Sequence, residues 1–255
     1  LTGGLGNDTL TGGLGDDTYV VDPSGADTIV EAAGGGSDTL DYSVFTTSVT
    51  VSLAGTTAPG TNGIAHIENL TGGAGDDVLT GDANANRLSG GPGTDALAGG
   101  LGDDTYLVAA DGGADTIAEA AGEGTDTILG PDVDTDWIVT PDLDGDGVAD
   151  QVDSGYVTGG TVFYGIEHLV GGSADDSFRF DGGGSLSGGI QGGGHVAGDA
   201  LLGPNTANTW SITGANAGTL NGNGFSQIEN LIGGNLDDAF AFGSGGSISG
   251  LVEGG

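Results

Sequence analysis

Aspartate residues recur at fixed positions after glycines along much of this sequence. Residues 3–11 read GGLGNDTLT, residues 12–20 read GGLGDDTYV, and residues 72–107 hold four further frames of nine residues. The shared pattern is G-G-x-G-x-D-x-U-x, where U is a large apolar residue. A hard divalent cation takes about six to eight oxygen ligands at ~2.3–2.6 Å. Glycine turns offer backbone carbonyls, and the short Asp side chain reaches the same point, so the pattern predicts binding of such a cation.

The frames also predict how the ligands are shared. If alternate frames lie on the same edge, a cation sits between frame n and frame n+2, so that Asp77 shares an ion with Asp95 and Asn86 with Asp104. The same reasoning predicts a ligand or a ligand-presenting turn at each of these residues: Gly3, Gly6, Asp8, Gly12, Gly15, Asp17, Asp27, Asp38, Gly72, Gly75, Asp77, Asn86, Gly90, Gly93, Asp95, Gly99, Gly102, Asp104, Asp115 and Asp126. The alternative is that Asp and Gly only form Asx-turns between strands. The Asx-turn interpretation is stronger for the Asp-Asp pairs at 175–176 and 237–238, where the second glycine of G-x-G is missing.

A second motif, DLDGDGVADQVD at 142–153, predicts another cation site. Its acids stand at positions 1, 3, 5, 9 and 12 of an EF-hand-type loop with Gly147 at the sixth, namely Asp142, Asp144, Asp146, Asp150 and Asp153. The flanking segments WIVTP and SGYVTGGTVF favour strands, so the loop would lack the usual pair of helices. An acidic surface insertion is the alternative interpretation.

Repetition predicts a β-solenoid. Each x-U-x tripeptide is a short strand with one inward side chain, which is buried only when turns stack. Residues 12–40 match 99–128, and a further unit from Trp137 to 180 recurs from Trp210 to 242. Both Trp residues and the pairs Phe178/Phe180 and Phe240/Phe242 are expected in the core. The predicted blocks are residues 1–66, 67–136, 137–209 and 210–255.

Charge excludes several classes of function. The 255 residues contain 37 acids, of which 30 are Asp, against two Arg and no Lys, and the formal net charge is −35. Such a chain lacks the basic side chains that binding to nucleic acids or anionic membranes requires, and it has no apolar run long enough to span a bilayer. Cysteine is absent, and no catalytic motif such as G-x-S-x-G or H-E-x-x-H is present, so an enzyme is not expected. His66, His168 and His195 are scattered and are expected to be surface or turn residues.

The frames at 1–40 and 67–128 resemble RTX (hemolysin-type) calcium-binding repeats, and the C-terminal half is similar to repeats of giant adhesin-like exoproteins. The resemblance implies an all-β parallel β-roll with several Ca²⁺ ions between turns, in a protein exported by type I secretion. It therefore implies an extracellular or cell-surface structural or adhesive segment of a larger bacterial protein, stacking into a fibre, stalk or surface layer. The implied partners are calcium, neighbouring repeats or copies, and cell-surface or carbohydrate ligands. The alternative is a secretion-and-folding module appended to a secreted enzyme or toxin.

Overall fold

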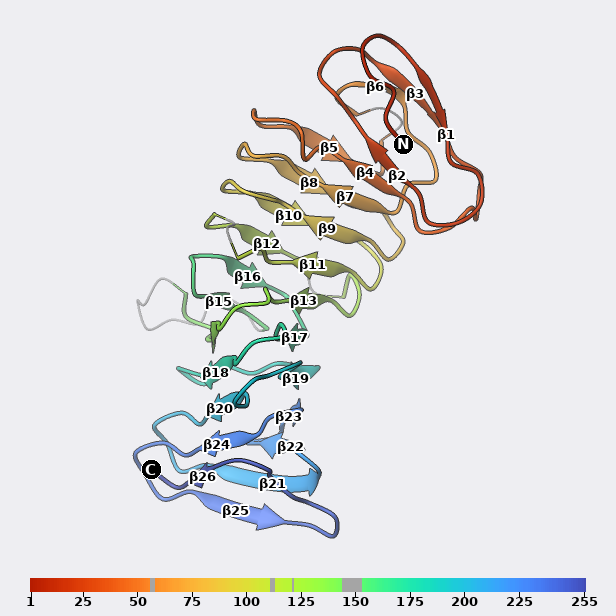
Figure 1. The fold of residues 1–255 in the computed structure, drawn as a ribbon. Helices are drawn as coiled ribbons and strands as arrows, with labels where there is room; N and C mark the ends of the chain where they lie inside the picture. Colours follow the sequence, from red (N-terminus) through yellow and green to blue (C-terminus); the bar gives the residue numbers. More distant parts are fainter. Residues whose placement is uncertain (56–57, 111–112, 121, 144–152) are drawn as a thin grey trace. The chain divides into compact units, whose positions relative to one another are not determined.

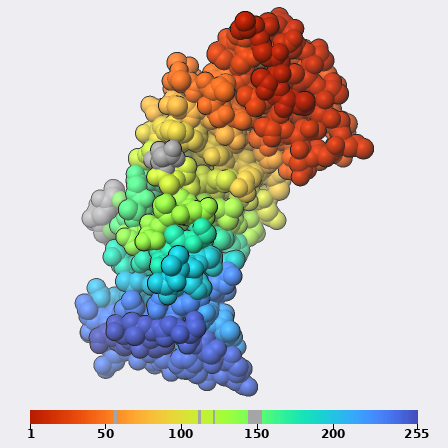
Figure 2. Space-filling model, in the orientation of Figure 1, coloured from red at the N-terminus to blue at the C-terminus, as the bar shows by residue number. Residues whose placement is uncertain are grey.

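The structure is a computed structural model that describes residues 1–55, 58–110, 113–120, 122–143 and 153–255. The chain forms two compact units, Leu1–Gly124 and Thr125–Gly255. The described residues form 26 strands, most of them three residues long, and no helix, so none of them forms a helix that could cross a membrane. Within each unit successive turns of the chain follow one another along the stack, as the colours of Figures 1 and 2 show.

Unit 1 is made of parallel strands that return to the same sheet once per turn. A small sheet contains β1 (Thr9–Thr11), β3 (Asp27–Val30) and β6 (Thr61–Gly63). A second sheet contains β2 (Thr18–Val20), β4 (Thr39–Asp41), β7 (Asn69–Thr71), β9 (Arg87–Ser89) and β11 (Thr105–Leu107). A third contains β5 (Thr50–Ser52), β8 (Val78–Thr80), β10 (Ala96–Ala98) and β12 (Thr116–Ala118).

The register of unit 1 aligns the inward apolar residues in columns. Leu88 pairs with Leu70 on one side and with Tyr106 on the other, while Leu79 pairs with Leu97 in the opposite sheet. All five side chains are at most 2% exposed. Strands of frame n therefore pair with strands of frame n+2, and the predicted fold of stacked parallel turns is confirmed.

The strands of unit 2 belong to two sheets, in which the parallel order is interrupted. One sheet contains, in spatial order, β13 (Thr127–Leu129), β17 (His168–Val170), β19 (Gly189–Gln191), β23 (Asn223–Ser226), β22 (Ala217–Leu220), β21 (Thr209–Gly214) and β25 (Ala239–Phe242). The other contains β16 (Val162–Tyr164), β15 (Gly155–Val157), β14 (Asp136–Val139), β18 (Ser177–Phe180), β20 (Ala200–Leu202), β24 (Asn230–Ile232) and β26 (Val252–Glu253).

The repeated Trp unit adds an antiparallel three-stranded meander to the otherwise parallel stack. Strands β14, β15 and β16 form the first copy, and β21, β22 and β23 form the second. In the second copy Asn221 (φ 51°) and Gly222 (φ 96°) form a two-residue turn. Positive φ at both central residues is typical of the type I′ hairpin turn, whose twist matches that of the antiparallel strands it joins.

The two Trp residues occupy the core as predicted. Trp137 stacks on Phe178 with ring centroids 5.6 Å apart, and Trp210 stacks on Phe240 at 5.2 Å. Both indoles are fully buried. The prediction is wrong for Phe242, which is 52% exposed because β25 lies at the edge of its sheet and no further described strand covers it.

We expect Leu79→Ala, measured by urea unfolding in saturating calcium, to lower the free energy of unfolding by about 2–5 kcal/mol, because it opens a cavity in a continuous column. Val78 is the matched control, since it precedes Leu79 in β8 and is 44% exposed. Val78→Ala should change the free energy of unfolding by no more than about 0.5 kcal/mol. Equal losses for the two variants would contradict the assignment of the inward face.

Candidate metal centres

The acids of unit 1 are joined from turn to turn by hydrogen bonds to the backbone. The N–H of Asp77 donates to Oδ1 of Asp95 at 2.7 Å, and the N–H of Asp95 donates to Oδ1 of Asp115 at 3.0 Å. At the other edge the N–H of Asp17 donates to Oδ1 of Asp38 at 2.8 Å. We call this arrangement the carboxylate ladder: each member accepts the N–H of the corresponding residue one turn earlier.

The ladder brings most of the predicted ligands into two columns and a short N-terminal pair. One column contains Asp77, Asp95 and Asp115, and the second contains Asp17, Asp38, Glu68, Asn86 and Asp104. The pair is Asp8 with Asp27, whose Oδ1 accepts the N–H of Asp8 at 2.9 Å. Asp77 is thus placed next to Asp95, and Asn86 next to Asp104, as the n/n+2 pairing predicts; whether each pair shares an ion stays a prediction.

The first glycine of each frame makes room for the Asp of the same frame. A Cβ at Gly90 would lie 2.2 Å from Oδ2 of Asp95, and a Cβ at Gly72 would lie 2.5 Å from Oδ2 of Asp77. The remaining first-position glycines are equally close to their Asp, at 2.1–2.9 Å: Gly3, Gly12 and Gly99. These glycines have no positive φ, so space and not backbone conformation requires them.

The fourth position requires glycine for a different reason. Its φ is 112° at Gly6, 103° at Gly15, 144° at Gly93 and 118° at Gly102, where side chains are disfavoured. Gly75 is the exception, since its Cβ would lie 2.3 Å from the backbone nitrogen of Ser48.

In the degenerate frame an amide replaces a carboxylate. The side chain of Asn86 accepts the N–H of Asp82 at 2.7 Å and donates through Nδ2 to the carbonyl of Glu68 at 2.8 Å. A donor therefore faces the preceding turn at this position. An amide that bridges two turns supplies a neutral link where other frames have a charge.

Unit 2 continues the same geometry beyond the recognisable frames. The N–H of Asp176 donates to Oδ1 of Asp199 at 2.8 Å, and the N–H of Asn208 donates to Oδ1 of Asp238 at 2.9 Å. Oδ2 of Asp176 also accepts the N–H of Gly172, as Oδ2 of Asp77 accepts that of Gly73. The pairs at 175–176 and 237–238 therefore have the geometry of the nonapeptide Asp.

Three glutamates that were not predicted as ligands are members of the ladder. Oε2 of Glu68 accepts the N–H of Asp38 at 2.9 Å. Oε2 of Glu167 accepts the N–H of Asp126 at 2.8 Å, and Oε2 of Glu229 accepts that of Asp199 at 3.0 Å. Each Glu stands two residues before an inward apolar residue, as Asp77 stands two residues before Leu79. That spacing was the signal that could have found them, since it identifies the ladder position without the glycines.

Glu31 is a further residue that was not predicted. Its carboxylate and those of Asp17 and Asp38 have ligand oxygens within 4.8 Å of one another. The hydroxyl of Tyr19 donates to Glu31 and accepts the N–H of Gly12 at 2.8 Å. The corresponding Tyr106 in the later copy donates to Glu119 in the same way. These Tyr–Glu pairs add a carboxylate beside the ladder at matching places in the two copies.

The EF-hand-type motif is described only at its ends. Asp144, Asp146 and Asp150 lie outside the described residues, as does Gly147. Asp153 is buried with φ 51°, and its carboxylate accepts the N–H of Ser187 at 2.6 Å and its hydroxyl at 3.0 Å. Strands β14, β15 and β16 confirm the predicted β flanks.

Burial of the ladder acids makes their negative charge energetically unfavourable. Nine of the acids named above as members of the ladder are at most 5% exposed: Asp27, Asp38, Asp77, Asp95, Asp104, Asp115, Asp176, Asp199 and Glu229. Desolvation raises the pKa of Asp95 and of Asp176 to about 6, and it also raises the pKa of Asp38, Asp104 and Asp199. The one Arg–acid ion pair among the described residues is Arg179–Asp181 at 2.7 Å, which lies outside the ladder. No described Lys or Arg therefore neutralises these acids.

Several carboxylate oxygens are buried without a hydrogen bond from any described residue. These include Oδ2 of Asp8, Oδ2 of Asp95 and Oδ1 of Asp176. Buried charge requires a partner, and oxygen-only ligand sets suit calcium. The residues present therefore fit Ca²⁺: the ladder acids would hold it, and the bound ion would supply the missing positive charge.

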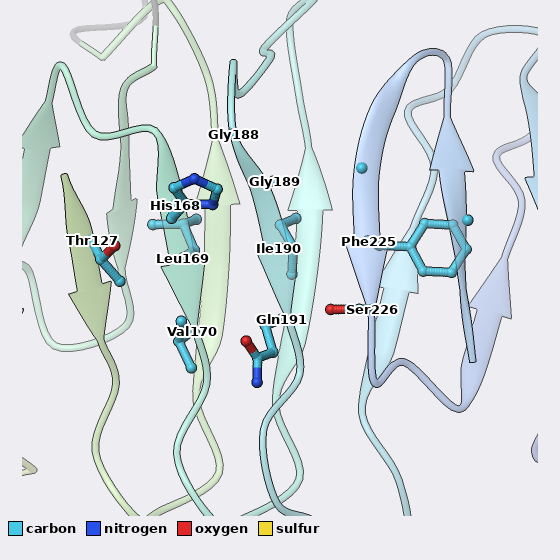
Figure 3. Close-up of a pocket in the computed structure, with 12 residues that line it drawn as sticks. Thr127, His168, Leu169, Val170, Gly188, Gly189, Ile190, Gln191, Phe225 and Ser226 are labelled. Carbon is cyan, nitrogen blue, oxygen red and sulfur yellow. The ribbon is translucent and has the colours of Figure 1, made fainter. Parts of the chain in front are cut away.

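A separate groove of about 480 Å³ lies over β17, β19 and β23 in unit 2. Figure 3 shows the His168 ring beside Gly188, with Gln191 and Ser226 further along. The glycines that line the groove have no side chains to fill it, and none of the described lining residues is acidic. The groove is therefore not part of the metal centres.

Comparison with known proteins identifies the repeats. Residues 1–22 and 69–106 match the family model of the RTX calcium-binding nonapeptide repeat, in four copies. None of the curated proteins matches the chain. The matched segments lie within those that were expected to contain RTX repeats. These repeats bind Ca²⁺, and their number implies several ions.

The pKa shifts predict how the metal-free fold responds to pH. Because folding raises the pKa of Asp95 and Asp176 from 3.8 to about 6, the folded chain binds more protons than the unfolded chain between these values. Stability in calcium-free buffer should fall as pH rises through 6. In that buffer we expect far-UV circular dichroism to show more β structure at pH 5.0 than at pH 7.5. In saturating calcium, where the chain folds, the urea midpoint should instead be higher at pH 7.5, since protons compete with the ion. More β structure at pH 7.5 than at pH 5.0 in calcium-free buffer would contradict this.

The ladder also predicts which acids matter for calcium. Asp95→Asn keeps the shape but removes a buried charge next to Asp77, so the calcium midpoint of folding should rise on the order of tenfold. In calcium-free buffer the same variant should show more β structure by far-UV circular dichroism than the wild type, because folding buries one charge fewer. Asp82→Asn is the control, since Asp82 is only half-buried, is not a member of the ladder, and its carboxylate bonds mainly to Asn84. Equal calcium midpoints for the two variants would argue against the ladder as the ligand set.

Proposed function

We propose that this chain is a calcium-dependent extracellular structural or adhesive segment of a larger secreted protein, which folds when Ca²⁺ binds outside the cell. RTX repeats are typical of secreted proteins. The observation that carries the proposal is the carboxylate ladder, in which successive turns bury acids directly above one another with no described Lys or Arg paired with them.

Calcium would act as the folding ligand. Without it, a formal charge of −35 repels itself, and turns that bury carboxylates are destabilised. The ladder does not exist in the unfolded chain, so the free energy of ion binding contributes to folding. Extracellular calcium modules bind at roughly 10⁻⁴–10⁻³ M, above cytosolic concentrations. The chain would stay unfolded during export and fold at its destination.

A structural role is favoured over a catalytic one. The acids of the ladder accept backbone N–H groups in a repeating pattern, which leaves them as turn elements and not as an acid–base pair in a cleft. The edge strand β25 exposes Phe242, and strand edges of this kind pair with further strands. We therefore propose that turns of the same chain or of another copy extend the stack into a fibre, stalk or surface layer.

An alternative is that the segment is a secretion-and-folding module appended to an enzyme or toxin. The complete gene distinguishes the two: many further copies of the Trp-to-Phe-x-Phe unit support the structural role, and an upstream catalytic domain supports the appendage. Surface or carbohydrate ligands, for which the groove of Figure 3 offers His168, Gln191 and Ser226, fit the first role.

We expect far-UV circular dichroism to show a disordered chain in chelator and β structure in millimolar Ca²⁺. Mg²⁺ should require a much higher concentration, because it demands octahedral geometry and gives up its waters reluctantly. A potassium chloride titration at matched ionic strength controls for charge screening. Identical β spectra in chelator and in calcium would refute the proposal, and equal midpoints for the two divalent ions would refute the assignment of the ligand set to calcium.

A further inference from the structure

One cluster of unit 2 departs from the oxygen-only chemistry of the ladder. Nδ1 of His195 lies 3.2 Å from Oε2 of Glu229 and 3.8 Å from Oδ2 of Asp199. One ligand atom from each of the three side chains lies within 4.8 Å of the others. Asp199 and Glu229 are buried ladder members, whereas His195 is part of the turn between β19 and β20.

The turn that carries His195 is longer than its counterparts. Gly192 stands seven residues before Asp199, and a Cβ there would lie 2.5 Å from Oδ2 of Asp199, as at the first position of a nonapeptide frame. The same spacing is five residues from Gly171 to Asp176. The two additional residues bring an imidazole to a place where other frames present only oxygen.

Neighbouring groups hold the turn after His195 and both carboxylates in place. Oδ1 of Asp175 accepts the N–H groups of the residues after His195, at 2.8, 2.7 and 3.0 Å from Val196, Ala197 and Gly198. Nδ2 of Asn216 donates to Oε1 of Glu229 at 2.7 Å, which orients its other oxygen. The N–H of Asp176 fixes Oδ1 of Asp199 at 2.8 Å. Outer hydrogen bonds of this kind are typical of metal sites.

One carboxylate oxygen that faces the cluster is left without a hydrogen bond. Oδ2 of Asp199 is buried and has no hydrogen-bond partner among the described residues, and Asp199 itself is 0% exposed. Distances of 3.2 and 3.8 Å from Nδ1 exceed the ~2.7–2.9 Å of a charge-assisted hydrogen bond. Ligand atoms of a tetrahedral zinc site lie roughly 3.3–3.6 Å apart, which these distances bracket.

We propose that His195, Asp199 and Glu229 form a binding site for a zinc-class divalent ion, which shares two acids with the ladder but differs from the all-oxygen calcium sites by its imidazole. Imidazole nitrogen is a ligand for Zn²⁺ and Co²⁺, whereas Ca²⁺ takes oxygen. Two carboxylates and one imidazole neutralise a doubly charged ion, and water completes four-coordination on the exposed side of His195. The site would crosslink the turn after β19 to the turn after β23.

The test is a Co²⁺ titration of the full chain in millimolar calcium, followed by visible absorption, with Zn²⁺ added afterwards. We expect one Co²⁺ with the visible bands of a four-coordinate site, which Zn²⁺ bleaches. His195→Asn should weaken Co²⁺ and Zn²⁺ binding at least about tenfold and remove the bands. It should leave the calcium midpoint of folding unchanged, since the ladder acids remain.

His66→Asn is the matched control, because His66 is exposed in unit 1 and Asn tolerates its positive φ of 59°. This variant should bind Co²⁺ as the wild type does. Equal Co²⁺ affinity of the wild type and His195→Asn, or displacement of Zn²⁺ by millimolar calcium, would overturn the proposal. If the chain folds fully without calcium, the proposed calcium-dependent folding is wrong. The same Co²⁺ titration in calcium-free buffer then tests the zinc-class site independently.

Discussion

Burial of carboxylates at the turns is the constraint on which both units depend. The inward columns of Leu, Ile and aromatic residues need the turns to stack, and stacking places each acid on the backbone N–H of the turn before it. One carboxylate oxygen is satisfied in this way, while another, as in Asp95, remains buried without a donor among the described residues. The apolar core and the acidic edge therefore form together, and a bound cation would stabilise both.

The glycines serve this arrangement in two different ways. At the first position the absent Cβ leaves room for the Asp side chain, as Gly90 does for Asp95. At the fourth position a positive φ turns the backbone, as in Gly93. Fifth-position side chains add an outer set of bonds: Oδ1 of Asp76 accepts the N–H of Thr94 at 2.9 Å. The recurrent glycines are thus a requirement of tightly stacked turns.

Unit 2 shows how much variation the ladder accepts. Antiparallel meanders, glutamates in place of aspartates and a lengthened turn all preserve the contact between a ladder oxygen and the N–H one turn earlier. The meanders return the chain to the sheet through Ile-Glu pairs, where Glu229 continues the column that Asp199 belongs to. The repeat unit is therefore defined by this contact and by the inward residue two positions later, and the nonapeptide is its most regular form.

The sequence by itself determined the features that repeat locally. A period of nine residues with one apolar side chain per tripeptide predicts the strands, the inward face and the pairing of alternate frames, because each depends on spacing along the chain. Only the tertiary structure decided which residues meet across turns of unequal length. Glu68 joined to Asp38, His195 facing Glu229, and Phe242 left half exposed all depend on what the adjacent turn places beside them. An insertion of two residues or a strand edge changes those neighbours without changing the local pattern.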